Sequence, residues 1–169
     1  MLTRLPDGTP ILVRPIRPDD KRLLEQGLHN LSETSVQRRF LSPKPSFSRA
    51  ELRYLTEVDG RHHVALVAES PTQPVRTLIG VARYVCLPGD PQAAEVAVVV
   101  ADAWQRRGVG TLLVEELGAR ARRLGFRRFT ATMASDNIAA RKLLAKIAEE
   151  PAWDPHGAVT EMVMELAAA

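Results

Sequence analysis

Residues 94–111, AEVAVVVADAWQRRGVGT, decide the fold of this 169-residue chain. They begin with an apolar run of Ala and Val that predicts a buried strand over Ala94–Ala101. A short polar turn follows and leads directly into an amphipathic helix over Gly108–Leu124. Residues Arg128–Ala134 then alternate with period two and predict a second strand, so the unit should place two parallel strands with a right-handed crossover.

The turn before the helix has the chemistry of an anion site. Gly108 and Gly110 remove side chains from the helix start, so that backbone N–H groups point at an anion which the helix dipole also favours. Arg106 and Arg107 add charge-assisted hydrogen bonds suited to phosphate oxygens. The turn therefore predicts a pyrophosphate cradle, although a capped helix after an arginine-rich turn explains it too. It is not a GxGxxG dinucleotide fingerprint, because Leu113 takes the place of the third glycine, and it lacks the GK[ST] ending of a Walker loop.

The remaining elements follow from the same two periodicities. Apolar runs predict further strands at Ile11–Ile16, His63–Ala68, Thr77–Cys86 and Val159–Leu166. Helical spacing and capping residues predict helices at 18–31, from Ser32 to Phe40, at Glu51–Thr56 and at Asn137–Ala148. We therefore predict one α/β domain, residues 1–169, built on a mixed sheet.

Composition limits the class of protein. The chain is 45% hydrophobic and 25% charged, as expected for one globular domain, and it has a net charge of only +3 with 5% aromatic residues. We therefore expect no nucleic-acid partner. No apolar stretch approaches the roughly 18–20 residues that cross a bilayer, and residues 1–10 lack the pattern of a signal peptide, so we expect no membrane partner. The single cysteine, Cys86, favours a reducing cytoplasm.

These motifs together resemble a known family. Gln105-x-x-Gly108-x-Gly110 is similar to the Q/R-x-x-G-x-G/A signature of the GNAT N-acetyltransferase superfamily, and Asn137-x-x-Ala140 is similar to its second acyl-CoA-contacting motif. The segments RPIRPDD, LSETSVQRRF, TEVDGRHHVALVA and IGVARYV resemble the bacterial protein lysine acetyltransferases. The resemblance implies a mixed, mostly antiparallel central sheet with a splayed parallel strand pair and helices on both faces.

It also implies that acetyl-CoA binds in the splayed gap. The backbone of Val98 and Val100 would pair with the pantetheine arm, and the amides from Arg106 to Thr111 would hold the pyrophosphate. Asn137 and Arg141 would contact the far end of the pantetheine or the adenosine. The predicted cofactor site is thus Val98, Val100, Gln105, Arg106, Arg107, Gly108, Val109, Gly110, Thr111, Asn137 and Arg141. No metal is predicted, because the adjacent His62 and His63 face opposite sides of a strand.

Glu95 is the candidate catalytic residue. A carboxylate in a strand of Ala and Val needs a partner, exposure or a function. An acceptor ammonium must lose a proton before its nitrogen attacks a thioester, and a nearby carboxylate can take that proton. In the lysine-acetylating relatives a glutamate on this strand is the general base, and the resemblance gives that role to Glu95. The alternative is a strand-end glutamate that faces solvent. The tyrosine that protonates the departing thiolate in many members is replaced here by Leu144.

The sequence thus predicts an acetyl-CoA-dependent N-acetyltransferase that transfers acetyl to a primary amine directly, in a ternary complex. The resemblance implies that the amine is a protein lysine, on a metabolic acyl-CoA synthetase. Two alternatives stay open. A small-molecule amine acetyltransferase predicts a deep acidic acceptor pocket instead of an open groove flanked by charges. A non-catalytic acyl-CoA-binding regulatory module predicts binding of acetyl-CoA without turnover.

Overall fold

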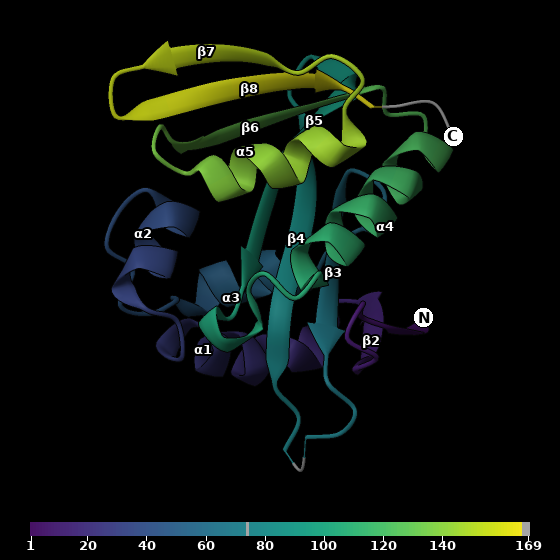
Figure 1. Ribbon diagram of the computed structural model, residues 1–169, viewed down its shortest axis with the longest axis vertical. Helices are drawn as coiled ribbons and strands as arrows, with labels where there is room; N and C mark the ends of the chain where they lie inside the picture. The colour runs from purple at the N-terminus through teal and green to yellow at the C-terminus, as the bar shows by residue number, and fades with distance from the viewer. Residues whose placement is uncertain (74, 167–169) are drawn as a thin grey trace.

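A computed structural model describes residues 1–73 and 75–166 of the chain. Its described strands form a single sheet in the order β1-β2-β3-β4-β5-β6-β8-β7 (Figure 1). All neighbouring strands pair antiparallel except β5 and β6, which are parallel. The predicted mixed, mostly antiparallel sheet is therefore confirmed. The strands are β1 (Leu2–Arg4), β2 (Pro10–Pro15), β3 (His63–Glu69), β4 (Leu78–Leu87), β5 (Asp90–Val100), β6 (Arg128–Ala134), β7 (Ala152–His156) and β8 (Val159–Glu165).

Helices cover both faces of the sheet, as predicted (Figure 1). On one face α1 packs on β4 and α3 packs against α1 in the same hydrophobic core, and on the other face α4 crosses β3, β4 and β5. Helix α2 contacts β5 and β6, near the place where these two strands diverge. The helices are α1 (Lys21–His29), α2 (Glu33–Phe40), α3 (Arg49–Thr56), α4 (Val109–Arg123) and α5 (Ile138–Leu144), with 3-10 turns at Pro18–Asp20, Asp102–Trp104 and Ala145–Ile147. No helix among the described residues is long and apolar enough to cross a membrane.

Each face of the sheet has its own hydrophobic core, because side chains alternate along the strands. On β4, Ala82 and Tyr84 are buried in the core beneath α4, whereas Val81 belongs to the core beneath α1 and α3. Consecutive residues of one strand therefore point into different cores.

A buried ion network joins the start of α1 to the sheet. Arg14 on β2 donates from Nη1 and Nη2 to the carboxylate of Asp20, at 2.7 and 2.8 Å, and from Nε to Glu69 at 2.6 Å. All three residues are buried, and Arg76 adds a second cation to Glu69. Asp20 also accepts a hydrogen bond from the backbone N–H of Arg17, so the network fixes the entry to α1.

The parallel strands β5 and β6 pair over three residues and then separate. Their register runs from Ala93 opposite Arg128 to Glu95 opposite Thr130. Beyond that point β5 continues to Val100 paired with β4, and β6 continues paired with β8. The predicted splayed strand pair is therefore confirmed, and α4 begins below the opening (Figure 1).

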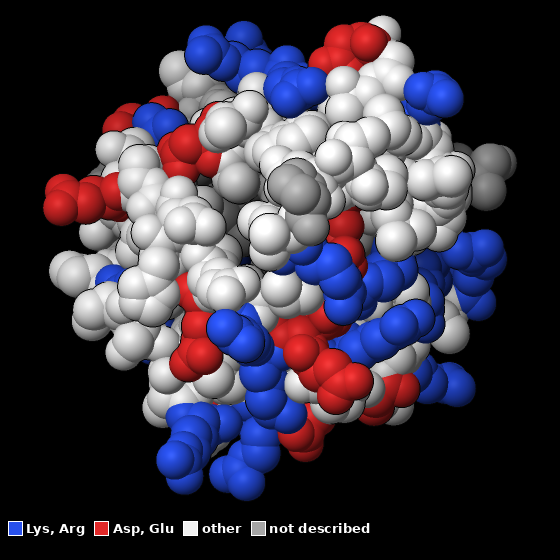
Figure 2. All heavy atoms as spheres, turned by 90° about the horizontal axis from the view of Figure 1, so that it is seen from below, with Lys and Arg blue, Asp and Glu red and all other residues white. Residues whose placement is uncertain are grey.

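Charge is not gathered at the end of the molecule where β3 and β4 are joined. Seen from that end, the Lys and Arg side chains lie among Asp and Glu side chains, beside a broad uncharged area (Figure 2). Opposite charges thus lie next to one another on this face, without an extended basic patch (Figure 2).

Candidate functional site

A cleft of about 310 Å³ lies where β5 and β6 separate. This volume is at the lower end of the range for small-molecule sites, about 300–1,000 Å³. The end of β5, the following loop, α5 and α2 line it. The lining includes most of the predicted cofactor residues, namely Val98, Val100, Gln105, Arg106, Gly108, Gly110, Thr111 and Asn137.

The loop before α4 has the geometry of an anion cradle. Gly108 is the N-cap of α4 with φ +98°, and no side-chain hydrogen bond caps this helix within the described residues, so its first N–H groups are available to a ligand. A Cβ on Gly110 would lie 3.0 Å from Leu143 and 3.5 Å from Val100, so a side chain there would enter the cleft wall. Arg106 has φ +59°, a left-handed conformation that costs a non-glycine residue about 1–2 kcal/mol.

A hydrogen-bond network connects this loop to α2. The Asp102 carboxylate accepts from the backbone N–H of Ser32 at 3.0 Å and from the hydroxyls of Ser32 and Ser35 at 2.7 and 2.8 Å. Gln105 donates from Nε2 to the Ser35 hydroxyl at 3.1 Å and to the Val100 carbonyl at 3.0 Å. Burial alone would raise the pKa of Asp102, but these hydrogen bonds outweigh it and lower the pKa. The first residue of the QxxGxG motif therefore holds the loop to β5 and α2.

Four cleft cations were not among the predicted residues. Arg38 and Arg39 come from α2, Lys142 comes from α5, and Lys146 comes from the 3-10 turn that follows α5. Lys146 donates from Nζ to the Thr111 hydroxyl at 3.0 Å, so it lies directly at the cradle. For the arginines, spacing is a signal that could have identified them: Arg38 and Arg39 are three and four residues from Ser35, so they lie on the same side of α2 as Ser35.

Three predicted cofactor residues do not line the cleft. Arg107 bonds the Asp7 carboxylate from Nη2 at 2.9 Å and stacks over the Trp104 ring, which fastens the loop to the β1–β2 turn. Arg141 stacks over the Trp153 ring, and Val109 is fully buried in the core.

Asn137 lies in the cleft wall and also acts as a helix cap. Its Oδ1 accepts a hydrogen bond from the Ala140 N–H at 3.1 Å, at the start of α5. The Asn-x-x-Ala motif thus has a local structural role. Seven residues later Leu144 is buried in the core. No acid stands at that position to protonate a leaving group.

Glu95 lies at the last register pair before the strands separate. Because it alternates with Val96 and Val98, which belong to the α4 side, its side chain is directed to the face of α1 and α3. It is exposed, and it is absent from the cleft lining. Burial lowers the pKa of Arg39, and the nearby Glu95 charge opposes that shift.

A second hollow, of about 830 Å³, lies beside α2. It runs from the end of α1 past α2 to the end of β6, with Leu28, Leu31 and Val36 along it. Charged side chains of both signs flank it, namely Glu33, Arg38, Lys44 and Asp136. Arg38 lines both hollows, so the second one adjoins the cleft.

Comparison with known proteins gives a consistent result. The acetyltransferase (GNAT) family model matches residues 29–148. Acetyltransferase Pat of Mycolicibacterium smegmatis is 36% identical over 136 residues, which cover 80% of this chain and 40% of that protein. Acetyltransferase PA5475 of Pseudomonas aeruginosa is 31% identical, over 96% of this chain and 87% of that protein. Among solved structures, the GNAT domain of S. lividans PAT superposes with a TM-score of 0.85 at 28% identity, covering 98% of this chain and 96% of that domain.

Proposed function

The chain belongs to the GNAT acetyltransferase family, whose members use acetyl-CoA, and from this premise we propose that it acetylates a lysine side chain of a protein by direct transfer in a ternary complex. The similarity to proteins named Pat supports this acceptor. The chain spans 40% of the Mycolicibacterium relative, so the acceptor is proposed for this domain from its own geometry as well.

The cleft offers groups that suit the chemistry of the co-substrate. Beyond Glu95, the β6 side of β5 has no strand partner, so the backbone groups of Val98 and the N–H of Val100 would be available to hydrogen-bond an extended pantetheine arm, while the Val100 carbonyl already accepts from Gln105. The N–H groups from Arg106 to Thr111 would hold the pyrophosphate, with Lys146 supplying charge beside them. Bound there, acetyl-CoA supplies an activated thioester.

The position of Glu95 is the observation that carries the proposed mechanism. It extends from the splay point to the opposite face from Val98, so an amine approaching from the α1–α3 face meets the carboxylate beside the gap. Glu95 would accept the proton of the ammonium, directly or through water, and so free the nitrogen lone pair for attack. A backbone N–H near Val98 would polarise the thioester carbonyl. With Leu144 buried, the thiolate would leave unprotonated or take its proton from water.

The surroundings of the cleft favour a protein acceptor over a small amine. The hollow beside α2 contains apolar side chains and charges of both signs, which suits a peptide segment. The alternative of a small amine requires an acidic pocket to hold a cation. Here the charged groups on the sheet that act on Arg39 are one carboxylate, Glu95, and another arginine, Arg83. This group of side chains is therefore not acidic.

The test is CoA release from acetyl-CoA with a deacetylated acyl-CoA synthetase as acceptor. We expect release by the wild type and at least a hundredfold lower kcat for Glu95→Gln. The matched control is Glu115→Gln, at an exposed position on α4. Release with a panel of small amines alone would contradict the protein acceptor. Binding of acetyl-CoA without release for any acceptor would instead support a regulatory module.

A further inference from the structure

Two arginines on the Glu95 face have no carboxylate partner. Arg83 on β4 is 6% exposed, and Arg39 is half-buried on α2. Within the described residues, neither guanidinium lies within 4 Å of an Asp or Glu oxygen. Buried cations are normally paired, so this pair of arginines requires an explanation.

The hydrogen bonds of Arg83 satisfy only one of its nitrogens. Nη1 donates to the Leu55 carbonyl in the last turn of α3 and to Nε2 of His63, both at 3.2 Å. Nε and Nη2 of Arg83 have no partner among the described residues. Arg122 Nε is the side-chain nitrogen of the described residues that is both enclosed and without a partner, so the two Arg83 nitrogens are open to solvent or to a ligand. Burial and repulsion from Arg39 lower the pKa of Arg83 to about 9.

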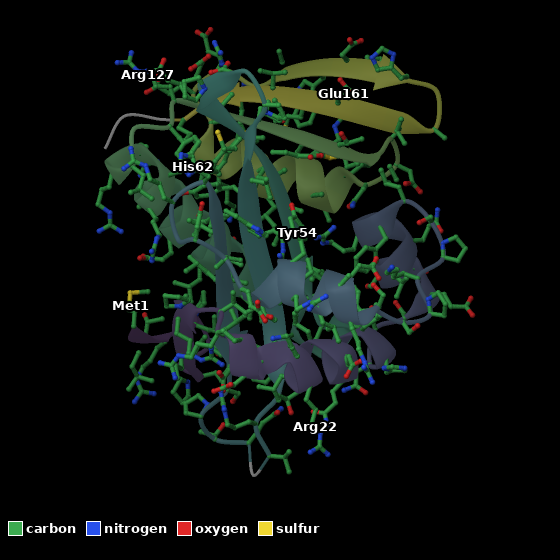
Figure 3. All side chains as sticks on the ribbon, turned by 180° about the vertical axis from the view of Figure 1, so that it is seen from behind. Met1, Arg22, Tyr54, His62, Arg127 and Glu161 are labelled. Carbon is green, nitrogen blue, oxygen red and sulfur yellow. The ribbon has the colours of Figure 1, made fainter. Side chains whose placement is uncertain are left out.

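Both arginines are near the proposed base. Arg83 is opposite Ala97 in the β4–β5 register, and Glu95 is two residues along β5 on the same face, so the two are diagonal neighbours within reach of long side chains. Arg39 approaches from α2. It is close enough to Glu95 for the carboxylate to favour the charged form of Arg39, and close enough to Arg83 for the two guanidinium groups to repel each other. Figure 3 looks onto this face and shows Tyr54 near its middle, where its ring lies 4.8 Å from that of His63.

Arg39, Arg83 and Glu95 together carry a net charge of +1, and the burial of Arg83 leaves its charge poorly solvated. A substrate that brings only an ammonium group adds a third cation and is repelled, whereas a carboxylate close to the ammonium compensates the charge. Guanidinium groups bind carboxylates through short, charge-assisted hydrogen bonds, and Arg83 has two unused nitrogens for this purpose.

We propose that Arg39 and Arg83 bind a carboxylate that the acceptor carries next to its reactive amine, which in a protein acceptor is an Asp or Glu side chain neighbouring the lysine. That the carboxylate comes from a protein rests on the proposed function. The chemistry that it requires, an amine beside a carboxylate, is shared by small amino acids. Polyamines, which bring only positive charge, should be poor acceptors.

The experiment compares two blocked peptides that differ in one residue, acetyl-Gly-Glu-Lys-Gly-amide and acetyl-Gly-Gln-Lys-Gly-amide, with 4-aminobutyrate and 4-aminobutyramide as a second pair. We expect kcat/KM of the wild type to be about tenfold higher for the glutamate peptide, mainly through KM, as one charge-assisted hydrogen bond requires. The preference should fall towards one in Arg39→Gln. It should also weaken as ionic strength rises, because salt screens the attraction.

The variants and the second pair make each outcome decisive. Arg83→Gln tests the buried partner if its melting curve shows that it folds, and Arg22→Gln is the matched control, since Arg22 is exposed on α1 and points away from the molecule (Figure 3). Equal kcat/KM for the two peptides in the wild type would overturn the inference and leave the proposed function intact. A preference that survives in both Arg39→Gln and Arg83→Gln would also overturn it. Turnover of 4-aminobutyrate over its amide, with no peptide turnover, would keep the carboxylate site and refute the protein acceptor.

Discussion

The cradle argument is tested most directly by replacing Gly108 with alanine. Gly108 has φ +98°, and a Cβ there would lie 3.0 Å from Cδ of Pro6, a rigid ring that cannot rotate away. The left-handed backbone costs alanine about 1–2 kcal/mol, and the contact adds about 1 kcal/mol or more. We therefore expect Gly108→Ala to lower the free energy of unfolding by about 2–3 kcal/mol.

Gly89, in the β4–β5 turn, provides a matched control. It has φ +81°, and nothing lies within 4 Å of its would-be Cβ, so Gly89→Ala has the backbone cost without the contact. The gain from restricting the unfolded chain is common to both substitutions and cancels in their difference. Gly108→Ala should therefore be about 1 kcal/mol less stable than Gly89→Ala.

Urea unfolding at pH 7 measures the stability difference, and calorimetric titration with acetyl-CoA measures its functional consequence. We expect the dissociation constant to rise about tenfold for Gly108→Ala, because the N–H groups at the start of α4 move, and to stay unchanged for Gly89→Ala. Equal stability and equal acetyl-CoA affinity of the two variants would refute the assignment of this loop as a cradle that excludes a side chain.

Three further perturbations test other parts of the fold. Arg14→Met should lower the free energy of unfolding at pH 7 by about 3–5 kcal/mol, because it leaves two buried carboxylates without their main cation; urea unfolding checks this. Gly27→Ala, within α1 and with no atom within 4 Å of the new methyl group, should raise the melting temperature through a gain of about 0.5–1 kcal/mol. Burial and the neighbouring Arg83 charge lower the pKa of His63 from 6.5 to about 4, so the histidine is neutral in the folded state. The neutral histidine therefore contributes to the free energy of unfolding above about pH 6.5, and this contribution is lost as pH falls towards 4, because the unfolded chain takes up the proton first. In urea unfolding, His63→Gln should lose less stability than the wild type between pH 7 and 5.

Most of the fold could be predicted because its elements carry strong local signals. The Ala and Val run of β5 predicts a buried strand, and the period-two pattern of β6 predicts a strand with one buried face. Strands β1 and β7 were not predicted. β1 is only three residues long, and β7 contains Pro155 and is largely exposed, so both are strands chiefly because a neighbouring strand pairs with them. The predicted helix at Asn137–Ala148 is shorter, because it changes to a 3-10 turn after Leu144.

The candidate site divides in the same way. The contiguous motif from Gln105 to Thr111 is enough to predict a cradle, since glycine spacing and helix start are local properties. Arg39 and Lys146 reach the cleft from helices far away in the sequence, and only the tertiary arrangement brings them there. Arg107 was predicted to meet the cofactor because of its charge, and Arg141 because of the family resemblance, but each stacks on a tryptophan that sequence spacing does not place beside it.

The separation of β5 from β6 also has a consequence for self-association. From Val96 to Val100 the protein has a strand edge in the middle of its sheet, with backbone donors and acceptors that no β6 residue occupies. Edges of this kind are templates on which foreign strands assemble into aggregates. An extended pantetheine bound along β5, as proposed above, would occupy the same hydrogen-bonding groups as an added strand. The co-substrate would then also cover this edge, and we expect the protein to aggregate more slowly as the concentration of acetyl-CoA rises.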